Sequence, residues 1–235
     1  MKRILYCLVA VGLVGCASES IPEDNLAGVQ RIDEPIAESE LRKFLRIVSR
    51  LPDKEPPTFS PLTDSFYVED PAEKLIQECR IRFEKQFDVE RQGKIWKQNR
   101  QIRQAAAKEK RSTTELAGLM TTLSTAICRA QFDSPQDLRQ IEQKGVEETT
   151  KLKKNLDRID ANLAKQSTTI LSRQRTELAM KLSRTVALVE YLKVLQRVPD
   201  ENIELVKRYQ EKLTSLVDQS ALDNLDPKSL TAAFD

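Results

Sequence analysis

The sequence contains four cysteines, Cys7, Cys16, Cys79 and Cys128, whose thiols are its most readily modified side chains. A thiol can be acylated, joined in a disulfide, or used as a nucleophile or a metal ligand. The chain contains no histidine. This excludes Ser-His-Asp and Cys-His catalysis, zinc sites with histidine ligands and histidine proton switches. Acylation and disulfide formation therefore remain as the chemistry to consider first.

Cys16 ends the short motif Leu13-Val14-Gly15-Cys16. Two basic residues and an apolar run that is too short to span a membrane precede the motif. The arrangement resembles the lipobox of bacterial lipoproteins, which implies cleavage before Cys16 and a lipid on its sulfur. The alternative is an ordinary secretory or transmembrane segment. A stop-transfer helix would need about 20 apolar residues, whereas this chain turns polar at Ser18.

The resemblance covers only residues 1–16, and no family is identified for the remainder of the chain. It implies removal of residues 1–15 as a signal peptide and attachment of the protein to the bacterial cell envelope. Ala17 stands where Gram-negative lipoproteins retained at the inner membrane usually have Asp, which favours the outer membrane. The polar residues 16–36, with their two prolines, predict a flexible tether between the lipid and the folded part.

The charge balance bears on the possible partners. The sequence has 38 basic and 36 acidic residues, and loss of Lys2 and Arg3 with the signal peptide leaves 36 of each. A neutral chain is not a general polyanion binder, so no nucleic-acid partner is predicted. The sequence also lacks a phosphate-binding glycine loop and a dinucleotide fingerprint, so no cofactor is predicted.

The pattern of apolar residues predicts an all-α fold, an elongated helical bundle over residues 37–222. A long antiparallel coiled-coil hairpin is expected over residues 135–198, broken near Ser167. Its seam advances in steps of four and three residues, through Leu152, Leu156, Ile159, Leu163, Gln166 and Ile170. The later half of its second helix, Val186 to Val198, is predicted as the central helix. The proline-rich residues 52–69 should lie extended over the bundle, and residues 223–235 should form a loosely ordered tail.

Cys79 and Cys128 permit two interpretations. In an oxidising compartment they could form a disulfide, which the chain-entropy model predicts to stabilise the fold by about 4 kcal/mol. Alternatively they are two separate buried thiols, because Cys79 shares an apolar helix face with Ile76 and Phe83. No metal site is predicted, since two thiolates without histidine lack the usual number of zinc ligands.

Residues 80–111 are strongly basic, with 11 basic and four acidic residues. As a helix, this stretch would turn Ile95, Ile102, Ala105 and Ala106 toward the bundle. The opposite arc would carry the candidate anion-binding residues, Lys94, Trp96, Lys97, Arg100 and Arg103. Such an arc could bind anionic lipid or peptidoglycan, with Trp96 at the lipid boundary. The alternative is a solvated face paired with acids elsewhere in the bundle.

One string is similar to an enzyme motif. Gly118-Leu119-Met120 is similar to part of a motif of lytic transglycosylases, which use one catalytic glutamate. That family has a Glu-Ser pair upstream of the triplet, which this chain lacks. The nearest acid, Glu115, belongs to a predicted capping box with Ser112.

The sequence therefore predicts a non-enzymatic, lipid-anchored helical scaffold on the periplasmic side of the membrane, which binds other envelope proteins through its hairpin. The second hypothesis is a binder of anionic envelope polymer or lipid through the basic residues 80–111. The third is a peptidoglycan-active enzyme.

Overall fold

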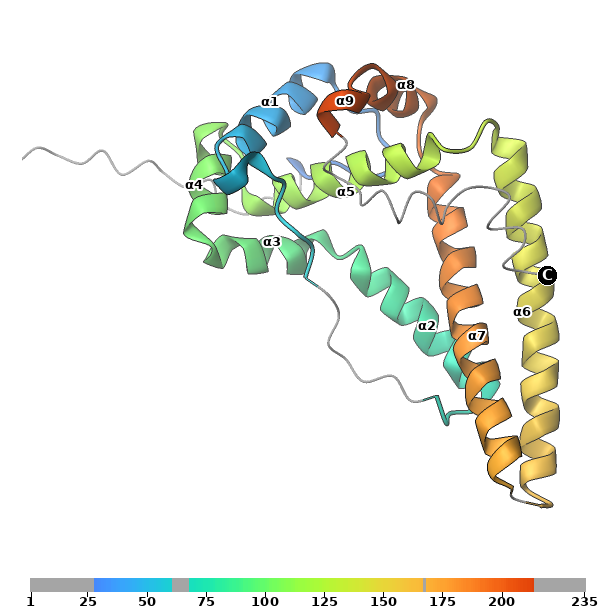
Figure 1. The fold of residues 1–235 in the computed structure, drawn as a ribbon. Helices are drawn as coiled ribbons and strands as arrows, with labels where there is room; N and C mark the ends of the chain where they lie inside the picture. Colours follow the sequence, from blue (N-terminus) through green and yellow to red (C-terminus); the bar gives the residue numbers. More distant parts are fainter. Residues whose placement is uncertain (1–27, 61–67, 167, 214–235) are drawn as a thin grey trace, which may run out of the picture.

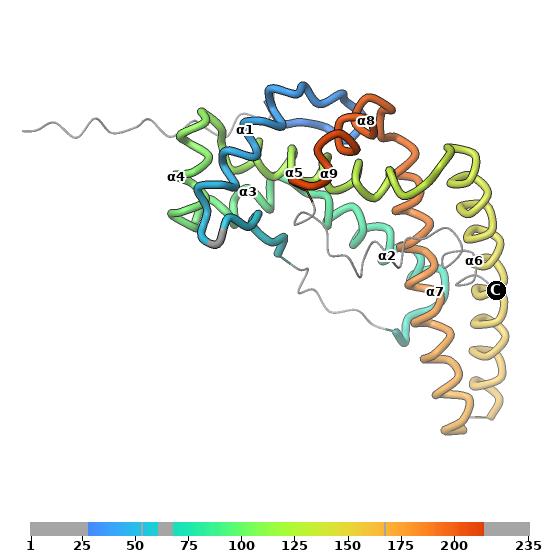
Figure 2. The backbone as a smooth tube through the Cα atoms, turned by 45° about the horizontal axis from the view of Figure 1, so that its top comes forward, coloured from blue at the N-terminus to red at the C-terminus, as the bar shows by residue number. Residues whose placement is uncertain are grey.

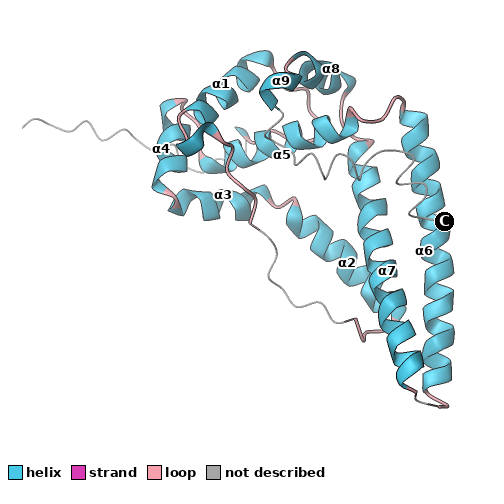
Figure 3. Cartoon of the chain, in the orientation of Figure 1, coloured by secondary structure: helices cyan, strands magenta, loops and turns pink. Residues whose placement is uncertain are grey.

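The computed structural model describes residues 28–60, 68–166 and 168–213. Within these ranges the regular structure is entirely helical (Figure 3), as the sequence predicts. The elements are α1 (Glu38–Ser49), η2 (Pro52–Lys54), α2 (Ala72–Gln86), α3 (Val89–Gln98), α4 (Arg100–Lys108), α5 (Thr113–Arg129), α6 (Pro135–Leu163), α7 (Thr169–Leu195), α8 (Asp200–Arg208) and α9 (Gln210–Leu213).

The helices form a head and an arm (Figure 1). In the head, α1, α3, α4, α8 and α9 gather around α5. The arm consists of α6 and α7, which run antiparallel side by side and extend away from the head, with α2 packed against α7. A view turned by 45° shows the same elongated shape (Figure 2). The predicted helical hairpin is therefore present, while its coiled-coil packing stays a prediction.

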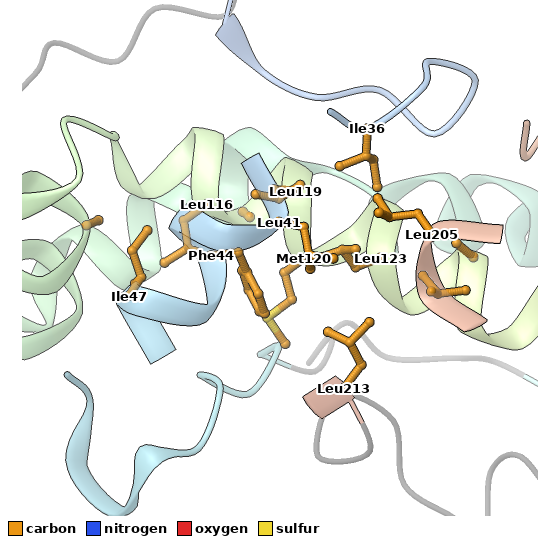
Figure 4. Close-up of a cluster of buried hydrophobic side chains, with 14 of the residues drawn as sticks. Ile36, Leu41, Phe44, Ile47, Leu116, Leu119, Met120, Leu123, Leu205 and Leu213 are labelled. Carbon is orange, nitrogen blue, oxygen red and sulfur yellow. The ribbon is translucent and has the colours of Figure 1, made fainter. Parts of the chain in front are cut away.

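Helix α5 is the central helix of the head, and the prediction that Val186 to Val198 would be central is wrong. Nearly every residue of α5 is buried, whereas within residues 186–198 the buried side chains alternate with half-buried ones, and Lys193 and Arg197 are exposed. Apolar side chains from α1, α8 and α9 converge on α5 (Figure 4). Three of its buried threonines, Thr121, Thr122 and Thr125, can be accommodated because each hydroxyl donates to a carbonyl one turn earlier, for example Thr122 to the Gly118 oxygen at 3.0 Å.

The helices α5, α6 and α7 each begin at a residue whose side chain caps the helix. Ser112 and Glu115 form the predicted capping box at α5, with each side chain accepting a hydrogen bond from the other residue's backbone N–H. Ser134 accepts from the backbone N–H of Asp137 at the start of α6. Thr168 accepts from that of Leu171 at the start of α7. These caps satisfy N–H groups that have no partner inside the helix.

The predicted tether extends too far along the chain. Residues 28–36 pack on the head, whereas the sequence predicted that they belong to the flexible tether. Ile36 is buried, and its backbone N–H donates to the Asn202 side chain of α8 at 2.7 Å. The same side chain donates to the Glu34 carbonyl at 2.9 Å. An apolar side chain and a buried amide thus fix a segment that its polar composition had assigned to the tether.

The core of the arm lies where α2 covers the hairpin. Leu152 and Leu156 of the predicted seam are buried there, in one cluster with residues of α2 and α7. Further out, Ile159 and Leu163 are half-buried and Ile170 is 71% exposed. The seam was predicted to be continuous, but only its inner half is covered, because α2 begins at Ala72 beside the middle of the hairpin.

Changing Leu156 to Ala should lower the free energy of unfolding by about 2 to 5 kcal/mol, since it removes a fully buried side chain and leaves a cavity. The exposed Lys154 on the same helix is the matched control, and its change to Ala should have an effect within about 0.5 kcal/mol. Urea denaturation followed by circular dichroism measures both. Equal losses of stability would show that the seam is misplaced.

Candidate functional site

The sequence predicted that one helix ends near Phe87 and that a second, basic helix runs from about Val89 to Lys110. The first division is present in the structure, but the predicted second helix is broken in two. The stretch is divided among α2, α3 and α4. The break between α3 and α4 falls at Asn99, whose backbone is extended (φ −82°, ψ 112°) and whose side chain accepts hydrogen bonds from Gln101 and Ile102. Asn99 therefore caps α4 instead of continuing α3. Asparagine competes with helical hydrogen bonding in this way, so the chain turns a corner here.

Trp96 was predicted on the exposed basic arc, and this is wrong. Its side chain is buried, at 3% exposure. The indole N–H donates to the Thr58 carbonyl at 3.1 Å, and the Phe59 ring lies 5.4 Å from it, centroid to centroid. The extended segment before residue 61 thus covers Trp96, in line with the prediction that residues 52–69 lie over the bundle. The remainder of that segment, 61–67, is outside the described residues.

The basic side chains of the same arc remain at the surface. Lys94, Lys97 and Arg100 are exposed and Arg103 is half-buried. Lys94 pairs with Glu90 at 2.6 Å, and Arg103 donates to the Lys97 carbonyl at 3.1 Å. The apolar arc is confirmed. Ile102, Ala105 and Ala106 of α4 are buried, and Ile95 of α3 is partly buried against the same core. The result is a cationic corner where α3 meets α4, without an aromatic anchor.

The candidate lipidation residue, Cys16, lies outside the described residues. The first described residue, Gly28, lies against the Glu115 side chain, which a Cβ on Gly28 would approach to 2.6 Å.

Cys79 and Cys128 are free and buried. They belong to different clusters, Cys79 to the arm core and Cys128 to the contact between α5, α6 and α7. This is the second of the two arrangements considered from the sequence. Burial raises the pKa of both thiols, which keeps them protonated and unreactive at neutral pH.

An ion cluster at the α4–α5 junction was not anticipated. The Glu109 carboxylate accepts from the Arg46 guanidinium at 2.7 Å and also from Arg50, both on α1. Two residues on, Arg111 bridges Glu40 of α1 and Glu115 of α5. Glu109 was recognised in the sequence only as one of few acids among many bases. Its partners are about 60 residues away, and no local pattern identifies them.

The enzyme-like triplet is part of this packing. Gly118 lies against residues 29 and 30, and a Cβ there would come within 2.9 Å of the Gln30 carbonyl oxygen. Leu119 and Met120 are buried. Glu115 is occupied by its cap and by Arg111. Packing thus accounts for the triplet. Leu119 also lines a small hollow with Glu40 and Glu115, and both of these carboxylates pair with Arg111.

Comparison with known proteins adds no relative, because no protein-family model, curated protein or solved structure matches this chain. Among the helices that the structure describes, none has the length and apolar character needed to cross a membrane. The described side chains also contain no group of three potential metal ligands.

Glu109 gives a pH prediction. Hydrogen bonds from Arg46 and then Arg50 lower its pKa from 4.5 to about 2. A carboxyl whose pKa is lowered on folding stabilises the fold above its unfolded pKa, and loses this effect as the pH falls through the folded pKa. The stability difference between wild type and Glu109→Gln should therefore be constant above pH 4.5 and shrink between pH 4.5 and about 2.

Urea denaturation across this pH range measures that difference. Glu204→Gln is the control. Glu204 is exposed, and its ion pair with Lys207 is long, at 3.7 Å. The stability difference between wild type and Glu204→Gln should therefore stay near zero throughout. A Glu109→Gln difference that does not change with pH would contradict the prediction.

Proposed function

We propose that this protein is a lipid-anchored helical scaffold of the bacterial envelope, and that the outer end of its arm binds other envelope proteins. One observation carries the proposal: the apolar seam of α6 and α7 continues beyond the part that α2 covers. Leu163, in the last turn of α6, is half-buried, and Ile170, in the first turn of α7, is 71% exposed. An isolated exposed apolar residue needs no explanation, but these two lie at the same end of the hairpin.

The dimensions support an arm that reaches away from its anchor. Helix α6 has 29 residues, which corresponds to about 44 Å at 1.5 Å per residue. Its outer end is held rigidly, because Arg175 of α7 pairs with Asp160 of α6 at 2.6 Å. The same guanidinium donates to the Asp70 carbonyl at 2.9 Å, which joins the start of α2 to the hairpin. A rigid, partly uncovered pair of helices is suited to accept a further helix.

The lipid anchor itself can be tested by metabolic labelling with a fatty acid in the native host. Wild-type protein should carry label and fractionate with membranes, whereas Cys16→Ser should be unlabelled. Cys79→Ser is the control for a general effect of removing a thiol, and it should label like wild type. Equal label in the wild type and Cys16→Ser would refute the lipid anchor.

The arm can be tested by photo-crosslinking in intact cells. A photoreactive side chain at position 170 should give discrete crosslinked products, and the exposed Ala161 on the outer face of α6 provides a control position that should give none. Leu163→Asp or Leu171→Asp should remove the products from position 170, since both leucines flank the open seam. Products of equal yield at positions 161 and 170 would speak against a specific surface.

A second candidate function is favoured by the exposure of Lys94, Lys97 and Arg100 at the cationic corner. This corner lies in the same end of the head as the entry of residues 28–30 beside Glu115. A lipid chain together with a basic patch holds a protein at a membrane better than either alone. Anionic lipid or peptidoglycan would then be the ligand of the corner.

The triple change Lys97→Gln, Arg100→Gln and Arg103→Gln should abolish binding of the purified chain, bearing Cys16→Ser, to vesicles that contain anionic lipid. Wild-type binding should weaken steeply as the salt concentration rises. The control changes three exposed bases of α6, Lys144, Lys154 and Arg158, to Gln. If both triple variants lose binding equally, or if binding is insensitive to salt, the corner is not the site.

A further inference from the structure

An open hollow lies between α2 and α7 beside the core of the arm. Its volume is about 350 Å³. It is lined by residues of both helices: Cys79, Arg82, Phe83 and Gln86 of α2, and Ser183, Arg184 and Ala187 of α7. We refer to it as the α2–α7 groove.

The groove combines apolar and cationic groups. Phe83 and Ala187 are half-buried and offer apolar surface, and Cys79 forms part of its floor. Arg184 is exposed and makes no ion pair within the described part of the chain. Arg82 adds a second guanidinium. A segment that fits this surface would carry apolar side chains interspersed with carboxylates.

The chain contains such a segment directly after α9. Residues 214–235 have four acidic residues and one basic residue. Within them, Leu222 and Leu225 are separated by three positions, and each is followed by an aspartate, Asp223 and Asp226. This is the pattern of apolar and acidic groups that the groove would accept. The segment lies outside the described residues, so its sequence is the basis of the comparison.

The segment is also long enough to reach the groove. Leu213, at the end of α9, packs on α5 in the head (Figure 4), and the far end of α5 packs on α7 near Leu192. Ala187 lies five residues from Leu192, which is about 8 Å along the helix. Half of α5 adds about 12 Å. The nine residues from Leu213 to Leu222 can span about 30 Å when extended.

We propose that residues 214–235 bind in the α2–α7 groove of the same molecule, with Leu222 and Leu225 against Phe83 and the aspartates toward Arg184. The interaction joins the C-terminal segment to the arm and covers apolar surface that the helices leave open. A partner that bound the arm at this position would have to displace the segment. The inference does not depend on the lipid anchor or on the partner of the hairpin end.

Disulfide trapping in the full chain tests the proposal. Cys7, Cys16 and Cys79 are changed to Ser, and cysteines are placed at Ala187 and Leu225. Mild oxidation should produce an intramolecular disulfide in most molecules, detected in the monomer by mass spectrometry. Val146→Cys with Leu225→Cys is the matched control, because Val146 is a similarly small apolar residue, exposed on α6, and it should react far less.

Charge changes then test specificity. Arg184→Glu should reduce trapping several-fold, and the further changes Asp223→Lys and Asp226→Lys should restore it. Raising the salt concentration should reduce trapping in the parent protein. Equal trapping at positions 146 and 187 would overturn the proposal, as would the absence of trapping. Disulfide-linked dimers in place of the monomeric product would assign the groove to a second copy and would also overturn it.

Discussion

The burial of α5 on every side is the constraint on which the other elements depend. A helix surrounded in this way must present small or apolar residues in all directions, and α5 does so with alanine, glycine, leucine and threonine. Thr121, Thr122 and Thr125 donate to their own helix, while Thr113 donates to the Gly93 carbonyl of α3. Gly118 lets residues 29 and 30 pass directly against the helix. The helices α1, α3, α4 and α8 are placed by this contact, and α7 joins the arm to it.

The charges follow from the same arrangement. The start of α5 is the point where several acids meet bases from distant parts of the chain, with Glu109 held by two arginines of α1. In the arm, the buried Glu148 of α6 is paired with Lys181 of α7 at 2.8 Å. A buried carboxylate requires such partners. The cationic corner at α3 and α4 has a local origin, because residues 80–111 contain 11 basic and four acidic residues although the whole chain is almost balanced.

The sequence predicted the features that depend on neighbouring residues. The all-α class, the capping box at Ser112 and Glu115 and the helical hairpin with its break near Ser167 all rest on local patterns, and they were predicted correctly. The position of Trp96 could not be obtained in this way, because it depends on a segment some 38 residues earlier that covers it. The end of α3 at Asn99 could have been predicted, because asparagine is a common helix cap. The basic residues on both sides of Asn99 instead suggested one continuous helix.

The outer end of the hairpin shows how a difference between the sequence pattern and the folded structure bears on function. Steps of four and three residues predict an apolar seam without saying what covers it. Leu152 and Leu156 are covered because α2 reaches them, and α2 is positioned by Arg175, which binds the carbonyls just before its first turn. Ile159 and Leu163 lie outside the cluster that α2 forms with the hairpin and are only half-buried. The extent of α2 thus separates a covered inner part of the seam from an accessible outer part, on which the proposed scaffold function depends.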